Sequence, residues 1–67
     1  MRAIEVNAMV KTVNHSTEGL PDAVERRQAE AQRLNALGLR NQLPNGLSHA
    51  WHFVVVNGWL MVQPGRG

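Results

Sequence analysis

Two apolar runs near the end of the chain, residues 51–56 and 59–62, flank the dipeptide Asn57-Gly58. Both runs are rich in β-branched and aromatic residues, which favour strands. The central residues of a type I′ turn need positive φ angles, which Asn and Gly tolerate, so this dipeptide between two such runs is a strong hairpin signal. We therefore predict an antiparallel C-terminal hairpin.

The two-residue turn also fixes the register of the predicted hairpin. It pairs Val56 with Trp59 and, counting outward, Trp51 with Pro64. Because side chains alternate between faces, one face is wholly apolar and holds Trp51, Phe53, Val55, Leu60 and Val62. The other face is polar only far from the turn and holds His52, Val54, Val56, Trp59, Met61 and Gln63. A ribbon covered on one side alternates apolar with polar residues, so we expect this hairpin to need cover on both faces.

Residues 2–13 carry apolar side chains at every second position from Ile4 to Val10, as a strand does. A helix is the alternative, because apolar residues also recur at helical spacing from Val6 to Val13. Several β-branched residues and the lack of an N-cap residue at the start favour the strand. We expect its apolar face to join the core.

A helix is predicted for residues 21–37. Pro21 suits the first turn, Asp22 can pair with Arg26 four residues on, and Gly38 supplies a left-handed stop. The expected buried stripe is narrow, with Arg27 intruding at one edge, and consists of Leu20, Val24, Ala31, Leu34 and Leu37.

These elements predict a small β-α-β-β domain of the α+β class over residues 1–67, with the hairpin packed against one helix. The connector 40–47 places Pro44 in a type I turn, and residues 63–67 are expected to fray. At 67 residues, one core barely offsets the chain entropy. The helix offers fewer large apolar side chains than the hairpin, so we expect it to cover one face of the hairpin and leave the other for a partner.

Composition adds little chemistry. The net charge of +2 is modest, so the high isoelectric point does not indicate a strong basic field, and the absence of Cys excludes disulfides and thiolate metal sites. The longest apolar run of the hairpin, residues 53–56, is far shorter than the ~20 residues of a membrane span. The N-terminal segment lacks a signal-peptide pattern, and we expect a cytoplasmic protein that does not enter a membrane.

No residues form a convincing catalytic, metal or cofactor site, so we expect no enzyme. Ser16 stands beside His15, but neighbours in a turn rarely act as nucleophile and base, and no third group orients them. His49 and His52 point to opposite faces of a strand, which disfavours shared metal coordination. Trp51, Phe53 and Trp59 raise base stacking and hence a nucleic-acid-binding regulatory protein as an alternative, but no basic residue interleaves with them.

The order of strand, helix and hairpin, with the segment 16–20 (Ser-Thr-Glu-Gly-Leu) leading into the helix, is similar in layout to the dodecins. The similarity covers about residues 10–37. Dodecins are small proteins that assemble into hollow flavin-binding oligomers, so the resemblance implies, as a remote alternative, an oligomeric small-molecule binder. No flavin-binding residue is carried over, because the connector 40–47 has no counterpart in that layout.

The leading hypothesis is a small, non-enzymatic protein-interaction module. It would act as an accessory subunit or inhibitor, through a homodimer or by docking on a larger protein. Trp and Met are enriched at recognition surfaces, so the expected partner-binding residues are those of the second hairpin face: His52, Val54, Val56, Trp59 and Met61.

Overall fold

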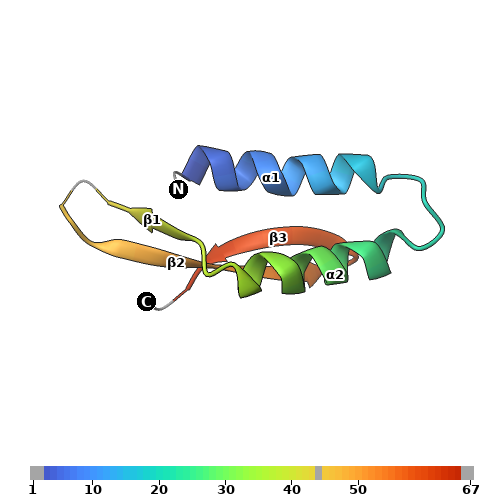
Figure 1. The fold of residues 1–67 in the computed structure, drawn as a ribbon. Coiled ribbons are helices and arrows are strands. Elements are labelled where there is room, and N and C mark those ends of the chain that lie inside the picture. The colour runs from blue at the N-terminus through green and yellow to red at the C-terminus, as the bar shows by residue number, and fades with distance from the viewer. Residues whose placement is uncertain (1–2, 44, 66–67) are drawn as a thin grey trace.

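The computed structural model describes residues 3–43 and 45–65, which form two helices followed by three strands (Figure 1). The elements are α1 (Ala3–Ser16), α2 (Ala23–Ala36), β1 (Arg40–Gln42), β2 (Ser48–Val56) and β3 (Trp59–Pro64). The strands form one antiparallel sheet in the order β1-β2-β3. The α+β class and the C-terminal hairpin are therefore confirmed.

The hairpin has the predicted register. Val56 pairs with Trp59, the pairing continues without a bulge to Trp51 and Pro64, and Asn57 and Gly58 have φ angles of 52° and 85°. Both central residues thus occupy the left-handed region that a type I′ turn requires. Local turn chemistry accounts for this part of the fold.

The predicted strand over residues 2–13 is wrong, because residues 3–13 belong to α1 and residue 2 lies outside the described residues. Its helical spacing places Val6 in the core, where its side chain is fully buried, with Met9, Val10 and Val13 packed beside it. β-branched residues cost a helix only a few tenths of a kcal/mol each, which is less than burying these side chains contributes. The element order is therefore α-α-β-β-β rather than β-α-β-β.

Both helices pack against the same face of the sheet. The buried core consists of Val6, Ala31, Leu34, Phe53 and Leu60. Trp51, Val55 and Val62, from the same face of the hairpin, are partly buried against this core. The wholly apolar face predicted from the register thus lies under two helices instead of one.

The predicted stripe of α2 is only partly right. Ala31 and Leu34 are buried, and so is Arg27, whereas Leu20, Val24 and Leu37 are exposed. Leu20 precedes the helix, and Leu37 follows its last residue, next to Gly38 with φ 63°. Val24 stands where α2 passes the hairpin turn: its Cγ2 atom would lie 3.3 Å from a Cβ atom built on Gly58.

β1 and the start of β2 extend beyond both helices (Figure 1), and the molecule measures 43 × 19 × 18 Å. Gln63 and Pro64, which were expected to fray, belong to β3, and the Gly65 N–H donates to the Ala50 carbonyl. Pro44 and residues 66–67 lie outside the described residues.

Candidate functional site

The predicted partner-binding residues lie together on the face of the hairpin opposite the helices. We call this the outer face and define it as His52, Val54, Val56, Trp59, Met61 and Gln63. Trp59, Met61 and Val56 are 48%, 45% and 41% exposed, while Val54 is half-buried and His52 and Gln63 are exposed. The outer face therefore presents an apolar surface near the turn and a polar end far from it.

Trp59 is held from one side by Arg27 of α2. The guanidinium carbon of Arg27 lies 4.1 Å from the centroid of the Trp59 ring, which is a cation–π contact. Arg27 is only 5% exposed. The indole therefore stands on the surface in a fixed position, with one of its faces covered by a buried cation.

Arg27 joins three segments of the chain through its guanidinium. Its Nε donates to Thr17 Oγ1 at 2.8 Å, Nη1 to the Gly58 carbonyl at 2.9 Å and Nη2 to the Asn14 carbonyl at 3.2 Å. The Asn14 carbonyl belongs to the last turn of α1, where the helix dipole is negative. Within the described residues Arg27 has no carboxylate partner, so backbone carbonyls and the ring stabilise this buried charge.

Two asparagines occupy the edges of the hairpin. Asn14 of α1 accepts from the Leu60 N–H at 2.9 Å and donates to the Leu60 carbonyl at 3.0 Å. Asn35 of α2 makes the same pair of bonds to Phe53, at 2.7 and 2.9 Å. Each side-chain amide thus makes the pair of hydrogen bonds that a residue of an added strand would make. Asn14 does so at the edge of β3, and Asn35 does so at the edge of β2.

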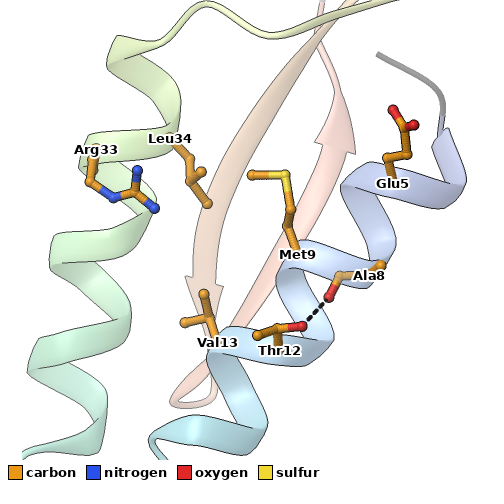
Figure 2. Close-up of a pocket in the computed structure, with 7 residues that line it drawn as sticks. All are labelled: Glu5, Ala8, Met9, Thr12, Val13, Arg33 and Leu34. Atoms are coloured by element: carbon orange, nitrogen blue, oxygen red, sulfur yellow. Dashed lines mark hydrogen bonds between the residues drawn. The ribbon is translucent and has the colours of Figure 1, made fainter.

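A groove of about 450 Å³ runs between the two helices (Figure 2). It is lined by Glu5, Ala8, Met9, Thr12, Val13, Arg33 and Leu34. In Figure 2 Met9, Val13 and Leu34 point into the space between the helices. The Thr12 hydroxyl donates to the Ala8 carbonyl at 2.8 Å, so it is engaged with the backbone.

The charge of Arg33 beside this groove is already paired. Arg33 Nη2 donates to Glu30 Oε2 at 2.7 Å, and this hydrogen bond holds the pKa of the Glu30 carboxyl below its usual value. The groove is therefore a largely apolar depression whose guanidinium is paired with Glu30, and Glu5 is a further charged residue of its lining.

The other polar candidates are also engaged locally. The hydroxyls of Ser16 and Thr17 donate to the Val13 carbonyl at 3.1 and 2.7 Å, and His15 Nδ1 lies 3.7 Å from Glu18 Oε2. No group of three His, Asp or Glu side chains that could hold a metal ion occurs within residues 3–43 and 45–65.

Comparisons of the chain with protein-family models, curated proteins and solved structures find no match. The layout shared with the dodecins depended on a strand before the helix, and since residues 3–13 belong to α1 that likeness no longer holds. In the part of the chain that the structure describes, neither helix has the length and apolarity needed to cross a bilayer.

Sequence reasoning found the outer face and missed Arg27, Asn14 and Asn35. The contacts of these three side chains join residues between 10 and 46 positions apart, so no local pattern encodes them. The one signal was an arginine within the apolar stripe of residues 21–37.

Proposed function

We propose that this protein is a non-enzymatic, cytoplasmic interaction module that binds another protein chain through the outer face. The observation that carries the proposal is the exposure of Val56, Trp59 and Met61 side by side on a sheet whose helices both pack on the opposite face. Aromatic residues and Met are enriched at the cores of protein interfaces.

The anchoring of Trp59 supports the same proposal. A large side chain that is already fixed by Arg27 loses less rotamer entropy when a partner covers it. A rigid, half-exposed Trp is the kind of residue that dominates binding energy at interfaces.

The nucleic-acid alternative is weakened by how the arginines are used. Arg26 pairs with Asp22 at 2.9 Å, Arg33 pairs with Glu30, and Arg27 is buried. These three side chains therefore offer little free charge to a phosphate backbone, which supplies most non-specific affinity for nucleic acid.

The test compares Met61→Gln with Leu37→Gln as a matched control, since both residues are exposed and only Met61 belongs to the outer face. Exposed substitutions of this kind change stability by about 0.5 kcal/mol or less. Chemical cross-linking in extracts of the native host, quantified against wild type, should show loss of the cross-linked product for Met61→Gln alone. Equal cross-linking by both variants would contradict the proposal, and binding that falls steeply with added salt would favour nucleic acid instead.

A further inference from the structure

We propose that the outer face binds a second copy of this chain, packed face to face about a two-fold axis that runs across the strands. In this arrangement the turn of one hairpin lies over the far end of the other. The inference rests on the proposed function of the outer face as an interface, and it adds the identity and orientation of the partner.

The charge of the outer face suits a copy of itself. Its six positions hold no Asp, Glu, Lys or Arg. A two-fold interface brings a surface against the same surface, and like charges across an interface cost several kcal/mol. An uncharged face avoids that repulsion, and it offers no charge with which to select a partner of opposite sign.

The edges of the hairpin are poor sites for a second copy, which favours the face. The outward-pointing backbone groups of Leu60 and Phe53 are taken by Asn14 and Asn35. Pro64, the last residue of β3, has no N–H to donate. Along the β3 edge of the described chain, Val62 alone keeps both outward-pointing backbone groups for an added strand, too short a stretch for strand addition.

Polar groups at one end of the outer face fix the direction of packing. A buried indole N–H usually has an acceptor, and among the six side chains of the outer face those with an acceptor atom for it are His52 and Gln63, at the end far from the turn. An axis across the strands places Trp59 over Gln63 of the partner subunit, and Val54 over its own counterpart. An axis along the strands would instead place Trp59 over an apolar side chain at the turn, away from His52 and Gln63 of the partner subunit.

The size of the outer face predicts a weak dimer. Two strands with three outward side chains each present a footprint on the order of 200–400 Å² at ordinary strand spacing, below the ~800 Å² per partner of a stable interface. We therefore expect a dissociation constant on the order of 10–1,000 µM.

The first experiment is sedimentation equilibrium of the whole chain at protein concentrations up to about ten times the expected dissociation constant. Wild type and Leu37→Lys should show the same monomer–dimer equilibrium, whereas Met61→Lys should raise the dissociation constant at least ~10-fold. A dilution series of wild type, monitored by NMR, needs no variant. The chemical shift of the Trp59 indole N–H should change with protein concentration. A wild-type monomer at every concentration, with an unmoved Trp59 signal, overturns the inference.

The second experiment tests the orientation and uses the absence of Cys from the chain. With a short bis-maleimide linker, Val54→Cys should cross-link to itself, and an equal mixture of Val56→Cys and His52→Cys should give a mixed dimer that neither variant gives alone. The proposed axis is overturned if the mixture of Val56→Cys and His52→Cys gives no mixed dimer, while Val54→Cys cross-links to added Met61→Cys.

The two proposals fail in different ways. A monomeric wild type whose host cross-links still depend on Met61 would remove the second copy as partner and leave the interaction function standing. Host cross-links that are insensitive to Met61, with no self-association, would remove both.

Discussion

Replacing Arg27 by Met should remove a large share of the protein's free energy of unfolding. The substitution keeps an apolar stem of similar length and removes three hydrogen bonds, to Thr17, Gly58 and Asn14, together with the contact on Trp59. Hydrogen bonds to charged groups contribute ~1.5–3 kcal/mol each, but removing a buried cation also removes its desolvation cost. We expect a net loss of about 2–4 kcal/mol in the free energy of unfolding.

This loss is a large fraction of the whole, because a chain of 67 residues has a total free energy of unfolding of roughly 3–10 kcal/mol, at ~0.05–0.15 kcal/mol per residue. Arg27→Lys should recover only part of it, since an ammonium group cannot present the planar fork that reaches three acceptors and lies against an indole. The conservative change therefore separates the effect of the guanidinium geometry from that of the positive charge.

The assay is urea unfolding followed by far-ultraviolet circular dichroism, with Trp fluorescence as a second probe. Arg26→Met is the matched control, because Arg26 lies next to Arg27 in α2 and forms an exposed pair with Asp22 that should contribute about 0–1 kcal/mol. The reasoning is refuted if Arg27→Met unfolds within about 0.5 kcal/mol of Arg26→Met, since surface substitutions fall within that margin.

Three further predictions concern a sheet edge, the turn and a surface pair. Asn35→Ala leaves the backbone groups of Phe53 without their partner and should cost ~1–3 kcal/mol; hydrogen exchange of the Phe53 amide should accelerate, and an unchanged rate contradicts the edge role of Asn35. Gly58→Ala combines a φ of 85° with a new Cβ contact at 3.3 Å and should lower the thermal midpoint by the equivalent of ~1–2 kcal/mol; an unchanged midpoint shows that the turn relaxes freely. Because the Arg33 hydrogen bond lowers the pKa of the Glu30 carboxyl in the folded protein, its stabilisation is present above the unfolded pKa and is lost as pH falls through the folded pKa. Wild type should therefore exceed Glu30→Gln in urea unfolding near neutral pH, and the difference should vanish in acid; a difference independent of pH contradicts this origin.

The hairpin and the outer face could be predicted from sequence because their determinants are local. The φ angles needed at Asn57 and Gly58 fix the turn, the turn fixes the register, and the register assigns every side chain of the hairpin to a face. No knowledge of the helices is needed for any of these steps.

The first helix could not be decided in the same way. The segment 3–16 satisfies both the strand and the helix period, and β-branched residues favoured the strand. The packing of Val6 and its helical neighbours against the sheet decides between the two, and propensity is a weak guide when tertiary contacts oppose it.

Side-chain amides tie each helix to a different strand, α1 to β3 through Asn14 and α2 to β2 through Asn35. Apolar contacts such as those of this core are not directional, so they select one alignment of a helix on a sheet less strictly than hydrogen bonds do. Each amide bonds a single residue at a fixed height along its strand, so sliding either helix would break two hydrogen bonds at once. The two asparagines therefore select one alignment of the helices on the sheet, and a unique native state does not depend on the small core alone.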